Sequence, residues 1–292
     1  MRLGSAVVFA TLLSVLCISL GAAAPAAGRA PAKAAKGKRA GYPWKKRVAS
    51  ARRFARHRAG SVSFAVVGER GNMRGLRARR EFHSASVVKA LLMTAYLRRP
   101  SVRHRSLNGG DKALLHPMIT RSDNATASTV FGLVGGDGLR RLARRAKLRD
   151  FHPNVVWGLT RISAGDMASF MYRLRRYLPR RHRHYALGLL AHVVRGQRWG
   201  IPPARPRGWR VYFKGGWTPA FGGWRINQIA RLTRGDRKLA LAVLTQGNPS
   251  HDYGTETIRG VTRRLLRRYN RLARSRGGIP KPPPDRRRVS TH

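Results

Sequence analysis

The sequence predicts an α+β fold, in which an antiparallel five-stranded sheet is flanked by N- and C-terminal helices and an all-helical lobe is inserted between strands. Strand-like segments fall into two groups, a hairpin within residues 61–84 and three strands within residues 209–247. Short turns separate the strands of each group, which is typical of antiparallel pairing. Helical patterning fills the gap between the groups, and amphipathic helices precede the first strand and follow the last.

The N-terminal helix is predicted from PWKKRVASARRFARHRAG, and Gly60 ends it. Its apolar face consists of Val48, Ala51, Phe54 and Ala55. The next stretch, SVSFAVVGERG, predicts a strand and a turn, and GLRARREFHS is the candidate second strand of the hairpin. HSASVVKALLM then begins a helix.

Helical patterning continues from Ala90 to about Pro203 and is clearest in SAGDMASFMYRLRRYL. There Ser163 is placed to cap the helix, and Asp166 stands where a capping-box acid would lie. The stretches WRVYFKGGW, WRINQIARLT and KLALAVLTQG predict three strands separated by turn residues. TETIRGVTRRLLRRYNRLA predicts a long C-terminal helix.

A signal peptide is expected over residues 1–24. Arg2 supplies a positive charge, residues 7–20 form an apolar run too short to span a membrane comfortably, and small residues follow as a cleavage site. The mature chain would therefore be secreted and would have no transmembrane segment. Its one cysteine, Cys17, would be removed, which excludes disulfides, thiol catalysis and cysteine-type metal sites.

The rest of the chain is expected to form a linker, a domain and a tail. Residues 25–41 are a flexible linker rich in Ala, Pro, Lys, Arg and Gly, and residues 275–292 are a disordered basic tail. The domain between them covers residues 42–274. It consists of an α/β lobe, residues 42–84 and 205–274, and a helical lobe, residues 85–204. A ligand cleft is expected where the two lobes meet.

The formal net charge is +50, from 61 basic and 11 acidic residues, while 42% of the residues are apolar and can form a core. Such a charge attracts nucleic acid, anionic lipid or anionic cell-wall polymers. The expected location is secreted or extracytoplasmic, where the basic surface could hold the protein on anionic cell-wall polymers. No RNP, zinc-finger or basic-zipper motif is present, and specific nucleic-acid binding is therefore not predicted. No metal or cofactor is expected, because the histidines form no tight pairs beside carboxylates.

The stretch HSASVVKALLM places Ser86 three residues before Lys89. On a helix these positions share a face, and a buried, neutral lysine amine could accept the serine proton. The ordinary alternative is a capping serine followed by a solvated lysine. The apolar neighbours of Lys89 count against it, because they indicate a buried helix. Ser84 is five residues from Lys89 and is expected only to end the strand or cap the helix.

Two further short motifs follow along the chain. ITRSDNATAS contains Ser122, Asp123 and Asn124, which alone are also compatible with a turn and a helix cap. In VYFKGGWTP, Lys214 ends a strand and two glycines follow. Alone, this pattern fits either a bulge at a sheet edge or the close approach of a ligand.

Together, the SVVK, SDN and KGG segments lie on a helix start, a loop of the helical lobe and a strand. This arrangement resembles the S-x-x-K, S-D-N and K-T-G set of class A β-lactamases and penicillin-binding proteins. The resemblance covers about residues 42–272. It implies a β-lactamase-like serine hydrolase, which forms an acyl-enzyme with a small β-lactam or with a D-alanyl peptide of peptidoglycan.

The resemblance implies four catalytic residues. Ser86 would be the acylated nucleophile, and Lys89 would activate it. Ser122 would pass a proton to the leaving nitrogen. Lys214 would supply positive charge for the substrate carboxylate and for Ser122. The backbone N–H groups of Ser86 and Trp217 would form the oxyanion hole.

The resemblance also implies the residues that bind substrate. Asn124 would orient Lys89 and hold the substrate amide, and Asp123 would stabilise the loop. The rest of this set is Gly215, Gly216 and Thr218. Because the third motif is K-G-G, Gly215 offers no hydroxyl for the carboxylate, and Thr218 could compensate. The bulky Trp217 is expected to narrow the cleft.

The largest departure from the family lies in the loop after the second motif. Class A β-lactamases carry a glutamate there, which activates the water that cleaves the acyl-enzyme. Between residues 131 and 164 this chain contains no glutamate, and its acids there are Asp137 and Asp150. The stretch DFHPNVVWGLTRISAGD stands in that place and looks short. We therefore expect acylation to be possible and deacylation of β-lactams to be slow.

Three functional interpretations remain open from the sequence. The first is the secreted serine hydrolase, acting as a β-lactamase or as a D,D-peptidase. The second is a catalytically impaired module that keeps the fold and binds the cell wall through its basic surface. The third, nucleic-acid binding, is suggested by charge alone.

Overall fold

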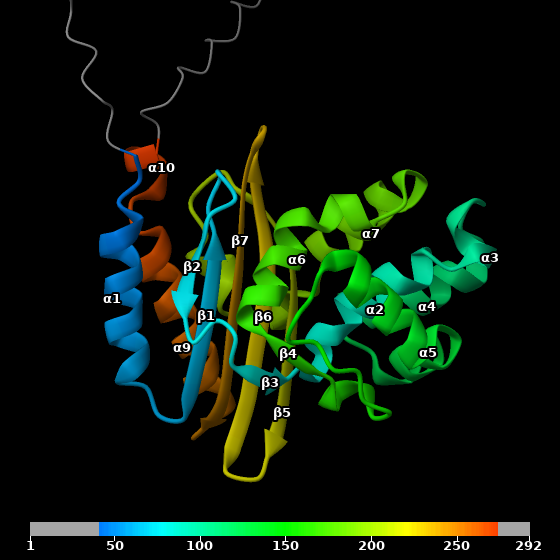
Figure 1. Cartoon of the computed structure of the whole chain (residues 1–292), viewed down its shortest axis with the longest axis horizontal. Helices are drawn as coiled ribbons and strands as arrows, with labels where there is room; N and C mark the ends of the chain where they lie inside the picture. Colours follow the sequence, from blue (N-terminus) through cyan, green and yellow to red (C-terminus); the bar gives the residue numbers. More distant parts are fainter. Residues whose placement is uncertain (1–40, 274–292) are drawn as a thin grey trace, which may run out of the picture. The chain divides into compact units, whose positions relative to one another are not determined.

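The structure is a computed structural model that describes residues 41–273 (Figure 1). The predicted signal peptide and tail, and the predicted linker except Gly41, lie outside the described residues. Within residues 41–273, no helix is both long and apolar enough to cross a membrane.

A five-stranded antiparallel sheet forms the centre of the fold, as predicted, with the strand order β2-β1-β7-β6-β5. Its strands are β1 (Ser61–Val67), β2 (Met73–Leu76), β5 (Arg210–Ala220), β6 (Gly223–Arg234) and β7 (Arg237–Asn248). The three long strands are nearly continuous runs of buried residues because helices cover both faces of the sheet.

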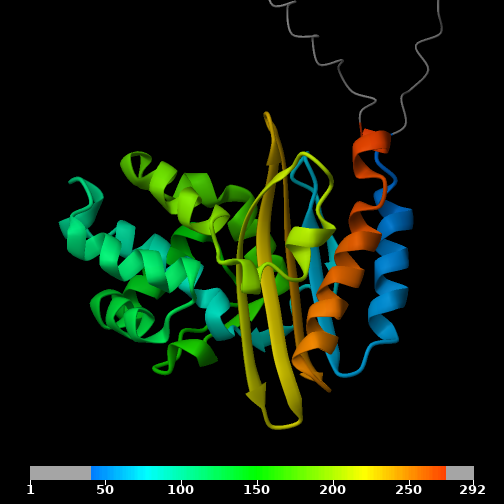
Figure 2. The ribbon, with the colours of Figure 1, turned by 180° about the vertical axis from the view of Figure 1, so that it is seen from behind.

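The helices from the two ends of the chain cover one face of the sheet (Figure 2). They are α1 (Trp44–Arg56), α9 (His251–Leu266) and the short α10 (Tyr269–Ala273). On α1, Val48, Ala51 and Ala55 are buried as predicted, while Phe54 is half-buried against α9. A Cβ on Gly260 would lie 2.3 Å from the Phe54 ring, so this glycine allows the two helices to pack closely.

The helical lobe lies against the other face of the sheet (Figure 1). Its helices are α2 (Lys89–Leu97), α3 (Pro100–Arg103), α4 (Gly109–Thr120), α5 (Asn124–Ala146), α6 (Ala164–Tyr177) and α7 (Arg183–Ala191), with α8 (Ile201–Ala204) leading back to β5. All nine residues of α2 are buried, which confirms that HSASVVKALLM enters the core.

Two local expectations were wrong. GLRARREFHS does not form one hairpin strand: β2 ends at Leu76, and Arg77 takes a left-handed φ of 46°. The later part, β3 (Glu81–His83), pairs instead with β4 (Arg161–Ser163). The inserted lobe is therefore not all-helical, because it contains β4. This pairing holds the loop before α6 against the segment just before Ser86.

The predicted cap of α6 is half confirmed. The Ser163 side chain accepts a hydrogen bond from the backbone N–H of Asp166, as expected of a cap. The Asp166 carboxylate instead accepts from the backbone N–H of Asp150, at 2.7 Å. It therefore holds the start of the loop in which the family carries its glutamate.

Candidate active site

Ser86 lies in a short 3₁₀ helix, Ala85–Val88, at the start of α2. It is partly exposed, whereas Ala85, Val87 and Val88 are buried. Ala85 has a φ of 46°, a conformation that costs energy for a residue with a Cβ and occurs often at functional sites. The chain thus presents one accessible hydroxyl at this turn.

Ser84 fixes this turn without capping it. Its backbone N–H donates to the Thr160 carbonyl at 2.8 Å, and its hydroxyl donates to the Ala85 carbonyl at 3.0 Å. No cap hydrogen bond is formed by its side chain. Ser84 therefore follows strand β3, as predicted, but does not cap the helix.

The Lys89 side chain is fully buried and its amine lies within a ring of acceptors. Nζ donates to the Ser122 carbonyl at 2.5 Å, to Asn124 Oδ1 at 2.7 Å and to the Asp123 carbonyl at 3.0 Å. The predicted contact between Asn124 and Lys89 is confirmed. Among the described residues, no hydrogen bond joins Lys89 to Ser86, so the amine must release one of these partners before it can accept the serine proton.

Burial is the main cause that lowers the pKa of Lys89 from 10.5 to about 8, and the nearby Asp123 opposes this shift. A lysine with this pKa is neutral in an appreciable fraction of molecules near neutral pH. A neutral amine has a lone pair that can take a proton, which is the property required of a general base.

Ser122 joins the two buried lysines. Its hydroxyl oxygen lies 2.9 Å from Lys214 Nζ and 3.4 Å from Lys89 Nζ. Its φ of 61° is left-handed, so the loop holds this serine in a strained conformation. Asp123 stabilises the loop as expected, because its carboxylate accepts from the backbone N–H of Thr126 and caps α5.

Lys214 is fully buried on β5 and donates to Ser122 Oγ and to the Gly215 carbonyl at 2.7 Å. Burial first, and the charge of Lys89 second, hold the pKa of Lys214 well below its usual value. Neither amine forms an ion pair with a carboxylate among the described residues. The site therefore attracts anionic substrate groups and developing negative charge.

Gly216 lets strand β5 approach the nucleophile. A Cβ at this position would lie 2.7 Å from the backbone nitrogen of Ser86 and 2.8 Å from that of Val87. Asn227, paired with Gly216 on β6, donates to the His83 carbonyl at 2.9 Å and accepts from the Thr245 N–H. These contacts place the β5 backbone beside the Ser86 amide, as an oxyanion hole of Ser86 and Trp217 would need.

The neighbouring residues of β5 face the other way, because side-chain directions alternate along a strand. A Cβ on Gly215 would lie 3.0 Å from the indole of Trp199, and the Trp217 ring lies 6.0 Å from that of Trp199. The expectation that Trp217 narrows the cleft is therefore wrong, because its indole packs on the face of the sheet away from Ser86. The indole of Trp199 therefore fills the space into which a side chain at position 215 would extend.

Thr218 lies on the same side of β5 as Lys214 and Gly216, by the same alternation. It is half-buried, and its hydroxyl donates to the Pro219 carbonyl at 2.9 Å. A substrate carboxylate could replace that carbonyl as the acceptor. A role for Thr218 in binding substrate stays a prediction.

The loop that lacks the glutamate carries Trp157 into the site. Its ring centroid lies 4.8 Å from Lys89 Nζ, and its Nε1 donates to Ser128 Oγ at 3.1 Å. The two acids between residues 131 and 164 are engaged elsewhere, Asp137 with Arg140 and Asp150 with Arg79. An indole face thus covers the lysine amine.

Sequence reasoning missed three residues of the site: Asn227, Trp157 and Trp199. Asn227 could have been predicted from the sequence, because adjacent Asn and Gln residues in a largely apolar strand need hydrogen-bond partners once they are buried. The neighbouring Gln228 donates to the Trp199 carbonyl at 2.9 Å and so fixes the loop that fills the space beside Gly215. The two tryptophans had no local signal.

We expect Gly216→Ala to destabilise the protein, because the added methyl group would press on the backbone of Ser86 and Val87. Overpacking of this kind costs about 1–3 kcal/mol. Urea unfolding followed by circular dichroism measures the loss. Gly188→Ala is the matched control, because nothing lies within 4 Å of its Cβ position in α7. Equal stability of the two variants would contradict the close approach.

Comparisons with known proteins agree with this arrangement. The model of the β-lactamase enzyme family matches residues 112–269, which include Ser122, Asn124 and Lys214 and begin after Ser86 and Lys89. A comparison with curated protein sequences finds no match.

Solved structures of β-lactamases share the fold. A β-lactamase from Sphaerobacter thermophilus superposes with a TM-score of 0.65 at 20% identity, over 79% of this chain and 99% of that one. A class A β-lactamase from Mycobacterium abscessus gives 0.63 at 21% identity, over 77% and 99%. An ancestral class A enzyme, from the last common ancestor of Gram-negative bacteria, gives 0.67 at 20% identity, over 77% and 99%. Because the family model matches more than half of its length, this chain belongs to the β-lactamase enzyme family.

Proposed function

We propose that this protein is a secreted serine hydrolase that forms an acyl-enzyme at Ser86 with β-lactams or D-alanyl peptides and releases it slowly. The observation that carries the proposal is the chain of contacts from Lys89 through Ser122 to Lys214, beside the accessible Ser86. This chain joins a base, a relay hydroxyl and a fixed cation, which are the groups that amide cleavage by a serine needs.

In the proposed acylation, Ser86 Oγ attacks the amide carbonyl carbon and its proton passes to neutral Lys89. The backbone N–H groups of Ser86 and Trp217 hold the oxyanion. The C–N bond then breaks, and the leaving nitrogen takes a proton from the Ser122 hydroxyl, which regains one from Lys89. The positive charge of Lys214 favours this transfer because it stabilises negative charge on Ser122 Oγ.

The substrate class follows from the charge of the site. β-Lactams and D-alanyl peptides both carry a carboxylate near the amide that is cleaved. Two buried amines without an acidic partner favour such an anion, with Lys214 and Thr218 as its expected contacts. Secretion would bring the enzyme to peptidoglycan.

Slow release is supported by Trp157. Hydrolysis of the ester needs a water molecule and a base that activates it. The indole over Lys89 provides no carboxylate, and its apolar face excludes water from the amine. The acyl group would therefore stay on Ser86 longer than in an enzyme with a glutamate in this loop.

Ser86→Ala should abolish covalent labelling. After exposure to benzylpenicillin, intact-protein mass spectrometry should show one adduct on the wild type and none on the variant. Ser84→Ala is the control that removes the neighbouring hydroxyl, and it should still be labelled. If several acylating probes leave the wild type unmodified, the catalytically impaired wall-binding module becomes the better explanation.

The acylation rate should rise with pH. The pKa of Lys89 is lowered to about 8, so protonated lysine predominates below that value and the neutral base above it. Stopped-flow labelling should therefore show a rate that increases through about pH 8. Lys89→Arg, which stays protonated throughout, should remove this rise. A rate that is flat or falls over the same range would exclude Lys89 as the base.

Trp157→Ala should speed deacylation without preventing acylation, because it opens the amine and the ester to water. The expected gain is at least about tenfold, which is below the roughly 10²–10⁴-fold of general base catalysis because the variant adds no carboxylate. Loss of the adduct over time, followed by mass spectrometry, measures it. Trp157→Phe keeps an aromatic ring beside the Lys89 amine, so deacylation of this variant should stay slow. If the alanine variant releases its adduct at the wild-type rate, Trp157 does not protect the ester.

A further inference from the structure

Two hollows lie side by side between the helices α6 and α7 and the edge strand β5. Their volumes are about 770 Å³ and about 690 Å³. They share four lining residues, Arg175, Leu187, Arg210 and Tyr212, so they form one elongated depression, which we call the basic groove. None of the residues that line it belongs to the catalytic set.

Cations dominate the basic groove. Six arginines line the first hollow, and Arg231, Arg234 and Lys238 add to the second. The side chains of Arg175, Arg210 and Arg234 have no hydrogen-bond or ion-pair partner among residues 41–273. Asp236 is the one carboxylate among the lining residues, and it is exposed in the turn between β6 and β7.

Arg231 is the distinctive feature of the basic groove. Its side chain is only 6% exposed, and it points from β6 toward α6, where Nη1 donates to the Tyr172 carbonyl. Its Nε is buried and has no partner within the described part of the chain. A buried guanidinium normally has a counter-charge, because desolvating an unpaired cation is costly.

Neighbouring positive charges increase the free-energy cost of burying the Arg231 guanidinium. Burial first, and Arg175 second, lower the pKa of Arg231, and burial first, with Arg231 next, lowers the pKa of Lys238. Lys238 is partly compensated by the Tyr172 ring, whose centroid lies 4.6 Å from its amine. These groups repel one another, and an anion between them would relieve the repulsion.

We propose that the basic groove binds a linear polymer of repeating phosphate groups without bases, with one phosphate beside Arg231. Arginine predominates over lysine in the lining, and its planar group can form paired hydrogen bonds to phosphate. Two hollows in series fit successive phosphates of one chain better than a single small anion.

A nucleic acid fits the groove less well. Single-stranded nucleic acids are held by aromatic platforms on which bases stack. Of the aromatic residues that line the groove, Trp209 is 2% exposed and Tyr212 is half-buried. A polymer that lacks bases needs no such platform. The inference concerns a second site and does not rest on the proposed hydrolase activity.

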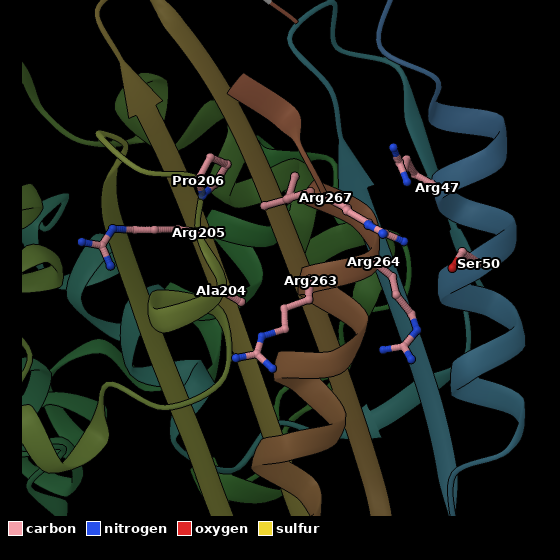
Figure 3. Close-up of a pocket in the computed structure, with 9 residues that line it drawn as sticks. Arg47, Ser50, Ala204, Arg205, Pro206, Arg263, Arg264 and Arg267 are labelled. Atoms are coloured by element: carbon pink, nitrogen blue, oxygen red, sulfur yellow. The ribbon is translucent and has the colours of Figure 1, made fainter. Parts of the chain in front are cut away.

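Another hollow, between α1 and α9, is also rich in arginine but is a weaker candidate for an anion-binding site (Figure 3). Arg205 donates to the carbonyls of Trp209 and Pro202, and Arg264 donates to Gly260 and stacks 3.8 Å from the Phe54 ring centroid. Arg47 has an unpartnered Nε but is only half-buried. Two of its five arginines donate to backbone carbonyls, and none of the five is buried.

The test is binding of poly(glycerol phosphate), inorganic polyphosphate, orthophosphate and a thymidine oligonucleotide, measured by calorimetry at several salt concentrations. The groove variant is Arg175→Gln, Arg210→Gln and Arg234→Gln together. The control variant is Arg141→Gln, Arg144→Gln and Arg145→Gln together, which removes the same charge from exposed positions of α5. Thermal melting by circular dichroism verifies that both variants fold.

We expect the groove variant to lose at least about tenfold in affinity for the base-free polymers and to lower the slope of log affinity against log salt by up to about three, while the control changes little. Arg231→Met should weaken binding likewise. If poly(glycerol phosphate) binds more tightly, the natural ligand is a wall polymer. If inorganic polyphosphate binds more tightly, the natural ligand is polyphosphate. Equal losses in groove and control variants would overturn the proposal. So would groove-dependent binding of the oligonucleotide with equal affinity, or of orthophosphate as tightly as a polymer.

Discussion

The hydroxyl of Ser122 lies between two buried lysine amines, and much of the active-site structure serves to hold them there. Lys89 comes from the helical lobe and Lys214 from the sheet, so both lobes must supply one cation each to the same oxygen. With no carboxylate in contact, the charge is balanced by backbone carbonyls and the Asn124 side chain. Burial is the main cause of the two low lysine pKa values, and carbonyl dipoles offset it less than a carboxylate would.

This arrangement requires the lobes to meet at a fixed distance. Gly216 removes the side chain that would separate β5 from the turn at Ser86, and Asn227 bonds the same turn to the centre of the sheet. Two strained residues of the helical lobe, Ala85 and Ser122, lie in the turn at Ser86 and in the loop that contacts Lys214. Strain at such positions persists only where the surroundings hold the backbone on several sides, and here the buried α2 and the long strands do so.

The sequence was sufficient for the long elements and for the residues of the three motifs that the fold brings together, Lys89, Ser122 and Lys214. β5, β6 and β7 have strong apolar and β-branched patterns with clear turns, and α1 and α6 have clear stripes. The catalytic set rests on three short motifs whose order along the chain is informative even where each one is weak. The pairing of β3 with β4 could not be foreseen, because it joins two three-residue strands that are far apart in the sequence. The direction of Trp217 follows from strand alternation once Lys214 faces the site, and the positions of Trp157 and Trp199 depend on how loops fold back.

The contact between Trp199 and Gly215 has a consequence for how this sequence can change. The indole occupies the space into which a threonine at the second place of the third motif would extend. In a family-like Lys-Thr-Gly segment, the threonine side chain would press on this indole, so Trp199 would have to shift to accommodate it. The two positions are therefore coupled, and a smaller residue at 199 would make the threonine easier to accept. The departure in the motif thus belongs to a pair of residues on different elements.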